Sequence, residues 1–162
     1  TMMVPFQIIM TPLYIEVYKF HLLDTYLGLI LPRATSAFGI YMMSSFFTGL
    51  PKSLEESGRI DGMSEFRIFR SIMLPLCKPA LVSLGIFHFM NNWNDLLYPL
   101  MLTSSQNKRT LSAGLAVLVG NKVIKYGPTL AATMISLTPL LVLYIFCQKY
   151  FIEGVATAGM KE

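Results

Sequence analysis

The sequence predicts an all-α integral membrane protein, and three observations support this fold class. Hydrophobic residues make up 54% of the 162 residues and charged residues only 14%, whereas a soluble domain carries about 25% charged residues. The mean hydropathy is +0.55, and the apolar residues gather in long runs that suit a bilayer as solvent. The chain begins with Thr1 and shows no signal peptide. We therefore expect it to be the C-terminal part of a longer protein.

Four apolar segments predict membrane-spanning helices, which would leave both ends of the chain on one side of the membrane. The predicted segments are about 2–18, 26–47, 79–102 and 130–151. A helix over the second of these would be about 33 Å long at 1.5 Å per residue, enough to cross a bilayer. Prolines occur within all four segments. Membrane helices tolerate proline where neighbouring groups satisfy the freed carbonyls.

Arg33 is a charged residue inside the second apolar segment. An arginine at the centre of a bilayer costs about 2.5–3.5 kcal/mol on insertion scales. In one interpretation, Pro32 begins a helix and Arg33 lies near the outer interface, where its side chain reaches water. In the other, Arg33 lines a polar path through the membrane.

Two hydrophilic segments, 49–78 and 103–128, connect the later membrane segments. The first holds four of the nine acidic residues, whereas the charges of the second are all basic. Lys and Arg are slightly more numerous around 49–78 and near the chain end than on the opposite side, which favours a cytoplasmic position for 49–78. The net charge of +4 is spread along the chain. We therefore expect no nucleic-acid partner.

Within 49–78 the pattern predicts a helix, a turn and a second helix outside the membrane. Ser53 and Glu56 have the spacing of a capping box at the start of the first helix. Glu55 and Arg59 are four residues apart in the order that stabilises a helix. Gly62 then provides a position at which the chain turns with little steric cost.

The second helix of this segment is predicted to begin after Ser64 and to end at Leu74–Pro75. Phe66, Phe69 and Met73 would form one apolar stripe along it. A short helical hairpin has no core of its own to cover such a stripe. The stripe could lie on the bilayer surface or dock into a groove of a soluble partner.

The spacing of residues 56–75 decides between these alternatives, because it resembles the EAA motif of binding-protein-dependent ABC importers. That motif reads E-A-A-x-x-x-G-x(9)-I-x-L-P. The matching residues are Glu56, Gly62, Ile72, Leu74 and Pro75. Ser57 and Gly58 replace the two alanines, and Gly58 weakens a helix by about 1 kcal/mol relative to alanine.

The resemblance covers the whole chain and is strongest to the carbohydrate subgroup, akin to the maltose-type permeases. It extends over L-G-L-I-L-P-R-A-T-S-A-F-G-I-Y, N-N-W-N-D-L-L-Y-P-L and F-I-E-G-V-A-T-A-G-M-K-E. Arg33 stands where an uncharged residue is expected. The resemblance implies the last four helices of a six-helix permease in a bacterial inner membrane, translocating a carbohydrate. A non-sugar solute is the alternative cargo.

The resemblance also implies partners and a role for the hairpin. The partners would be two ATPase subunits, which use ATP and Mg²⁺, a second permease forming a heterodimer, and an extracytoplasmic solute-binding protein. Segment 49–78 would be a cytoplasmic coupling loop, 103–128 would face the binding protein, and this chain itself would bind no cofactor. The residues assigned to ATPase docking are Glu56, Arg59, Gly62, Phe66, Arg67, Phe69, Arg70, Leu74 and Pro75. Phe66 and Phe69 would be the anchors, with arginines around them, whereas Glu56 and Gly62 would shape the hairpin.

Polar side chains near the end of the third apolar segment form a second candidate site. Its residues are His88, Asn91, Asn92, Trp93, Asn94 and Asp95. Four of them have i, i+3, i+4 and i+7 spacing and would share one helix face. They could line a path for a sugar, whose hydroxyl groups suit Asn and Asp. Alternatively they could bond neighbouring helices and cap a helix break before Pro99, with Trp93 at the membrane interface.

Other function classes find little support. An ion-coupled secondary transporter would need acids inside the membrane, for which Asp95 is available, but it would need no docking hairpin. H-E-x-x-H, G-x-S-x-G and Walker A motifs do not occur. We therefore expect a transport subunit that hydrolyses no ATP itself and is not an enzyme.

Overall fold

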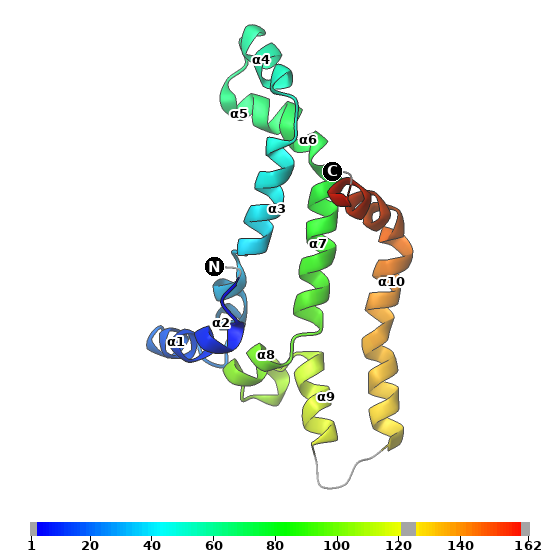
Figure 1. Ribbon diagram of the computed structural model, residues 1–162. Coiled ribbons are helices and arrows are strands. Elements are labelled where there is room, and N and C mark those ends of the chain that lie inside the picture. Colours follow the sequence, from blue (N-terminus) through cyan, green and yellow to red (C-terminus); the bar gives the residue numbers. More distant parts are fainter. Residues whose placement is uncertain (1–2, 121–125, 160–162) are drawn as a thin grey trace. The chain divides into compact units, whose positions relative to one another are not determined.

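The structure is a computed structural model that describes residues 3–120 and 126–159, and these residues form helices without any strand (Figure 1). The all-helical fold class predicted from the sequence is confirmed. The elements in chain order are α1 (Phe6–Lys19), α2 (Tyr26–Ile30), η1 (Leu31–Arg33), α3 (Ala37–Thr48), α4 (Lys52–Ile60), α5 (Glu65–Ile68), η2 (Phe69–Met73), α6 (Leu74–Leu76), α7 (Lys78–Trp93), α8 (Leu97–Leu102), η3 (Gln106–Lys108), α9 (Leu111–Val119) and α10 (Tyr126–Gly159).

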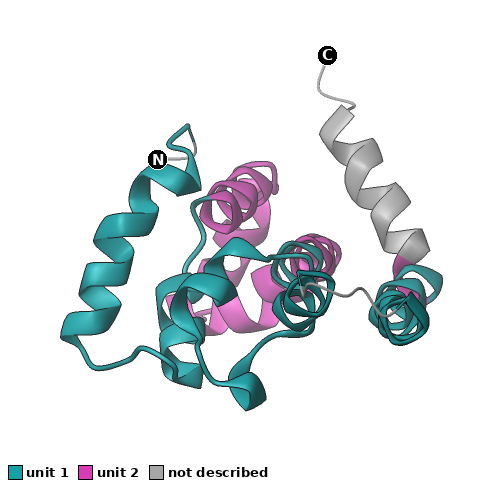
Figure 2. Cartoon of the chain, turned by 90° about the horizontal axis from the view of Figure 1, so that it is seen from below, with its two compact units in different colours: residues 1–37, 88–145 teal, residues 38–87, 146–162 magenta. Residues whose placement is uncertain are grey.

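The chain forms two compact units, shown in different colours in Figure 2. Unit 1 comprises residues 1–37 and 88–145, and unit 2 comprises residues 38–87 and 146–162. Helices α7 and α10 each contribute residues to both units.

Unit 1 has a small apolar core around α8, which contacts α1, α2 and α9. Val17, Tyr98 and Leu102 are its buried members, and the ring of Phe6 meets that of Tyr98 edge to face at 6.0 Å between centroids. The Tyr98 hydroxyl donates a hydrogen bond to the backbone oxygen of Gly28 at 2.9 Å. This bond satisfies the polar end of a buried ring and joins α8 to α2.

The loop before α2 is joined to the segment after α8 by Asp24. Its carboxylate accepts hydrogen bonds from the backbone nitrogens of Ser104 and Ser105 and from the Ser105 hydroxyl. Lys108 Nζ donates to the Asp24 backbone oxygen at 2.6 Å. The hydrogen bonds from Ser105 lower the pKa of Asp24, since they stabilise its ionised form.

Two of the predicted membrane segments do not form one continuous helix. Segment 26–47 is divided into α2, η1 and α3, with a non-helical link at residues 34–36. Segment 79–102 is divided into α7 and α8 by residues 94–96. Pro99 explains the second break, because its ring would clash with the carbonyl of residue 95 in a continuous helix.

In the other two predicted segments the helices are continuous: α1 begins at Phe6, after the non-helical residues 3–5, and segment 130–151 lies within α10. Pro12 lies inside α1 and Pro139 inside α10. Met2, the first residue of segment 2–18, lies outside the described residues. Residues Tyr126–Cys147 of α10 form one helix that is long and apolar enough to cross a bilayer. A second candidate is the pair Glu65–Leu76 and Lys78–Trp93, which meet at a bend of 70°.

Segment 103–128 is not a simple hydrophilic loop, because it contains η3 and the apolar helix α9. The Thr110 hydroxyl accepts a hydrogen bond from the backbone nitrogen of Ala113 and so caps α9. Sequence inspection missed this helix because basic residues flank it. Residues 121–125 of this segment lie outside the described part of the chain.

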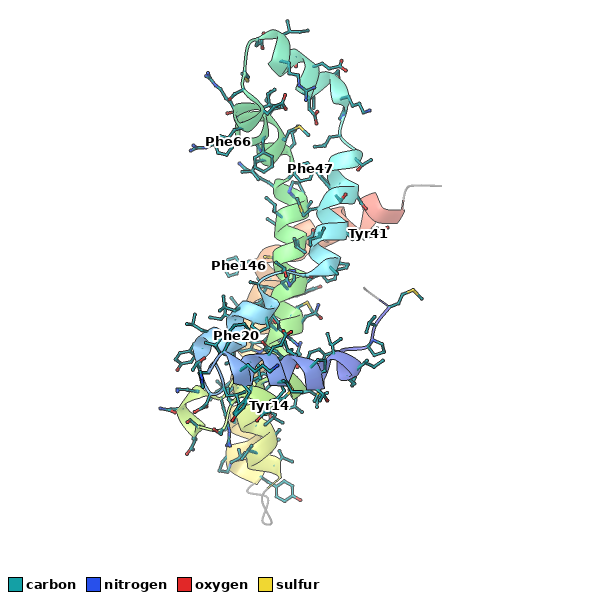
Figure 3. The ribbon with its side chains drawn as sticks, turned by 90° about the vertical axis from the view of Figure 1, so that its left-hand side faces the viewer. Tyr14, Phe20, Tyr41, Phe47, Phe66 and Phe146 are labelled. Carbon is teal, nitrogen blue, oxygen red and sulfur yellow. The ribbon has the colours of Figure 1, made fainter. Side chains whose placement is uncertain are left out.

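Large apolar side chains are exposed in both units, as Figure 3 shows for several labelled aromatics. Tyr14 on α1, Tyr41 on α3 and Phe146 on α10 are among them. An exposed apolar surface of this extent is typical of a chain that meets lipid or partner subunits.

Candidate functional site

The first candidate site is the hairpin of unit 2 formed by α4, α5 and η2, which follows α3 (Figure 1). The chain turns at Gly62, whose φ of +72° is the left-handed conformation that glycine adopts at little cost. The predicted turn at Gly62 therefore agrees with the structure. The predicted capping box does not, because α4 begins after Pro51 and Ser53 lies inside the helix.

Gly58 allows α4 to lie close against the second half of the hairpin. A Cβ atom at this position would lie 3.0 Å from a side-chain carbon of Ile68 and 3.0 Å from one of Ile72. Gly58 is buried by this contact. Glycine in place of the motif's alanine weakens the helix itself. The absence of a Cβ atom allows the close packing against Ile68 and Ile72.

Arg59 and Glu65 close the turn with an ion pair on the hairpin surface. Arg59 Nε and Nη2 donate to the two carboxylate oxygens of Glu65 at 2.7 and 3.1 Å. The predicted partner Glu55 lies further away, at 3.6 Å. The hydrogen bond from Arg59 lowers the pKa of Glu65 and raises the pKa of Arg59, because each charge stabilises the other.

The predicted aromatic anchors are exposed on the hairpin. Phe66 is 71% exposed and Phe69 is 44% exposed, whereas Met73 of the same predicted stripe is buried. The ring of Phe69 lies 6.2 Å from that of Phe47 at the end of α3. Ile60, which the sequence analysis did not assign, is 86% exposed at the end of α4. A hydrophobic residue at the last position of a charged helix is the signal that could have identified it.

The second half of the hairpin ends later than predicted. Helical structure continues through Leu74 and Pro75 to Leu76, and the chain bends after Cys77. Residues 69–73 form a π-helix, whose wider turn makes room for the ring of Pro75.

The other predicted docking residues, Glu56, Arg67 and Arg70, are all exposed.

The second candidate site is the polar cluster of unit 1, around the break between α7 and α8. The prediction that Asp95 shares a helix face with His88, Asn91 and Asn92 is wrong, because α7 ends at Trp93. Asp95 lies in the break, where its Oδ1 accepts a hydrogen bond from the backbone nitrogen of Tyr98 at 3.4 Å. The alternative prediction, a helix break capped before Pro99, describes this geometry.

Arg33 is the residue that organises the cluster, and the sequence analysis did not place it there. Its Nη1 makes an ion pair with Asp95 and donates to Asn92 Oδ1 at 3.1 Å. Its guanidinium carbon lies 4.2 Å from the centroid of the Tyr98 ring and 5.4 Å from that of Phe6. These contacts place Arg33 in the polar cluster of unit 1.

The asparagines of the cluster are partly engaged with their own helix. Asn92 Nδ2 donates to the backbone oxygen of His88, and Asn94 Nδ2 donates to that of Met90, each at 2.9 Å. Asn91 is exposed. Part of the predicted stripe therefore supports the helix end rather than projecting freely from it.

Trp93 is fixed by two contacts. Its ring stacks on Phe89 with 5.3 Å between centroids, and its Nε1 donates to the Ser136 backbone oxygen at 3.1 Å. The second contact joins α7 to α10. Trp93 is thus a packed residue at the end of α7.

Two cavities adjoin the polar cluster within unit 1. The larger, of about 460 Å³, is lined by His88, Phe89, Asn92, Trp93, Thr110 and Leu111. The smaller, of about 310 Å³, has Arg33, Asn92, Asp95, Tyr98 and Thr110 among its lining residues. Asn92 and Thr110 line both, so the two cavities share part of their walls. Groups of acids, His and Cys suited to a metal ion are absent from the described residues.

Comparisons with known proteins agree on one family. The family model described as "Binding-protein-dependent transport system inner membrane component" matches residues 1–155. The arabinooligosaccharides transport system permease protein AraQ of Halalkalibacterium halodurans is 38% identical over 160 residues, 99% of this chain and 57% of that protein. The sn-glycerol-3-phosphate transport system permease protein UgpE of Salmonella choleraesuis is 34% identical over 156 residues, 95% of this chain and 56% of that protein.

A solved structure has the same fold. It is the crystal structure of a bacterial ABC transporter involved in the import of the acidic polysaccharide alginate, with a TM-score of 0.77 and 26% identity. The similarity covers 87% of this chain and 55% of that one. The chain thus spans a little more than half the length of the relatives and of the structure that it matches.

Proposed function

Because the chain belongs to the family of binding-protein-dependent transport system inner membrane components, we propose that it forms part of the permease of an ATP-driven carbohydrate importer. The family predicted from the spacing of Glu56, Gly62 and Pro75 is confirmed. Its members are membrane components of transport systems rather than enzymes, as expected from the sequence. The permease would lie in the inner membrane and move a sugar handed over by an extracytoplasmic solute-binding protein.

The carbohydrate assignment is supported by the relatives that the chain resembles. One relative is named for arabinooligosaccharides, and the similar solved structure imports a polysaccharide. Another relative is named for sn-glycerol-3-phosphate, so a small non-sugar solute is the second candidate. An ion-coupled transporter is disfavoured because Asp95, the acid available for it, is paired with Arg33.

The hairpin would dock on the ATPase, and the exposure of Phe66 is the observation that carries this proposal. Phe66 and Ile60 are apolar side chains left uncovered on a hairpin with a charged surface. A groove on a partner would bury them as anchors, with Arg59, Arg67 and Arg70 around them. When ATP and Mg²⁺ close the ATPase dimer, the docked hairpin would carry the adjoining membrane helices with it.

The proposal also assigns each segment of the chain to one side of the membrane. Four membrane segments, 2–18, 26–47, 79–102 and 130–151, would leave both ends of the chain and the coupling loop 49–78 on the cytoplasmic side. Segment 103–128, with α9, would face the binding protein. The chain would pair with a second, different permease, and the ATPase subunits would bind the nucleotide.

Capture of the ATPase by the full-length permease tests the docking proposal. Phe66→Glu places a charge in the contact, so this variant should lose the ATPase during co-purification and lose uptake. Phe66→Leu keeps an apolar anchor and serves as the control that should retain both. If Phe66→Glu keeps its ATPase and its uptake, the hairpin is not the docking site.

A further inference from the structure

The ion pair between Arg33 and Asp95 lies on the wall of a cavity rather than in a closed core. The side chains are 30% and 15% exposed, and both line the cavity of about 310 Å³. A fully buried ion pair needs further hydrogen bonds to offset the desolvation of its two charges. Asp95 Oδ2 itself is buried against Arg33, so a ligand in the cavity would meet the pair mainly through the more exposed Arg33 guanidinium.

The two charges also have hydrogen-bonding capacity left for a ligand. In the described part of the chain, the polar contacts of Arg33 all use Nη1, although a guanidinium has five N–H donors. Asp95 Oδ2 is buried in the ion pair, whereas Oδ1 accepts only the long bond from the Tyr98 nitrogen and has a lone pair left for a hydroxyl donor. Donors and acceptors therefore stand side by side on the cavity wall.

This arrangement suits one chemical class of ligand. A sugar hydroxyl both donates and accepts, so neighbouring hydroxyls can bond Arg33 and Asp95 together. A carboxylate or phosphate only accepts, and it would lie beside the Asp95 carboxylate. Since the charges of the pair cancel, an anion would lose its hydration without a net attraction in return.

We propose that the Arg33–Asp95 pair is a charge filter of the translocation path, which favours uncharged saccharides over saccharides carrying a carboxylate or phosphate. The inference rests on the proposed function and narrows its substrate class. Family membership leaves this property open, because the path of such a permease can serve uncharged or acidic cargo. Arg33 and Asp95 would act as specificity-determining residues, with Asn92 holding the guanidinium in place.

The test compares two probes that differ in charge. These are arabinotriose and the aldonic acid made by oxidising its reducing end. Their dissociation constants are measured on the assembled transporter, which contains the full-length permease but no binding protein. Any preference between the two probes then comes from the membrane subunits. The wild type should bind the neutral probe at least tenfold more tightly than the acid.

Variants that change the charge of the pair then distinguish a role in ligand selectivity from a purely structural role. Asp95→Asn leaves Arg33 unbalanced and should reduce the preference for the neutral probe at least tenfold. Arg33→Gln should increase that preference. The double variant R33Q/D95N is again uncharged and should return to the wild-type ratio, which a purely structural role would not produce. Glu16→Gln removes an exposed acid on α1, outside the cavity, and should leave the ratio unchanged.

Two results would overturn the proposal. One is a ratio that stays the same in Asp95→Asn, and the other is an absence of binding by both probes at their highest soluble concentration. Neither result would contradict the proposed docking of the hairpin on the ATPase, because capture of the ATPase is measured independently of saccharide binding.

Discussion

The hairpin and the polar cluster use their charges in opposite ways. In the hairpin, Arg59 and Glu65 are six residues apart, lie on the surface and close a turn while the aromatic Phe66 is left exposed. In the cluster, Arg33 reaches Asn92 across 59 positions of sequence and is covered by two aromatic rings. The hairpin is thus a locally determined scaffold that presents apolar groups. The cluster is a long-range contact that holds charges in an apolar setting, and its residues should be less tolerant of change.

The largest expected effect is at Gly28, next to the cluster. A Cβ atom there would lie 2.1 Å from the backbone oxygen of Leu22, so Gly28→Ala forces the loop before α2 apart. We expect a loss of about 3 kcal/mol, as for severe overpacking, measured by thermal unfolding of the full-length permease in detergent. The control is Gly85→Ala on α7, where a Cβ atom meets nothing within 4 Å. Equal stability of the two variants would show that α2 does not pack as described.

The next effect is the loss of one charge from the cluster. Arg33→Gln leaves Asp95 without its partner and should cost about 2 kcal/mol of unfolding free energy, since an uncompensated charge is then held away from water. Adding Asp95→Asn should recover most of this loss. The double-mutant cycle of unfolding free energies measures the coupling. Additive losses would mean that the pair contributes no interaction energy.

A smaller effect is expected at the turn of the hairpin. Gly62→Ala places a Cβ atom on a backbone with φ of +72° and should cost about 1 kcal/mol. No atom lies within 4 Å to add a clash. Gly62→Asn is the matched variant, because asparagine tolerates this conformation better, and its loss should be smaller. If both variants matched the wild type in thermal unfolding, the left-handed turn would be contradicted.

The smallest effect concerns Glu65 and is best seen through pH. Its pKa is lowered by Arg59, so the pair stabilises the hairpin above the ordinary glutamate pKa of about 4.3. This contribution should fade as the pH falls through the lowered pKa of Glu65. Glu65→Gln should therefore be less stable than the wild type at neutral pH, and the difference should shrink on acidification. A difference independent of pH would exclude the ion pair as its cause.

The same contrast explains how much of the molecule the sequence could predict. The turn at Gly62 and the exposure of Phe66 follow from spacing within one short segment. The Arg33–Asp95 pair does not, because no local pattern shows which distant residues become neighbours. The end of α7 could be narrowed only to two alternatives, since the helical period continues through Asp95 whereas the ring of Pro99 disfavours helix four residues earlier. Ser53 has the spacing of a cap, but Pro51 sets the start of α4 earlier.

Photo-crosslinking from the hairpin in the assembled transporter tests the central claim most directly. Benzoylphenylalanine replaces Phe66 in one sample and Tyr126, an exposed aromatic at the start of α10, in the other. The account predicts an adduct with the ATP-binding subunit from position 66 and none from position 126. The absence of such an adduct from position 66, or its formation from position 126 alone, would contradict the docking of this hairpin on the ATPase.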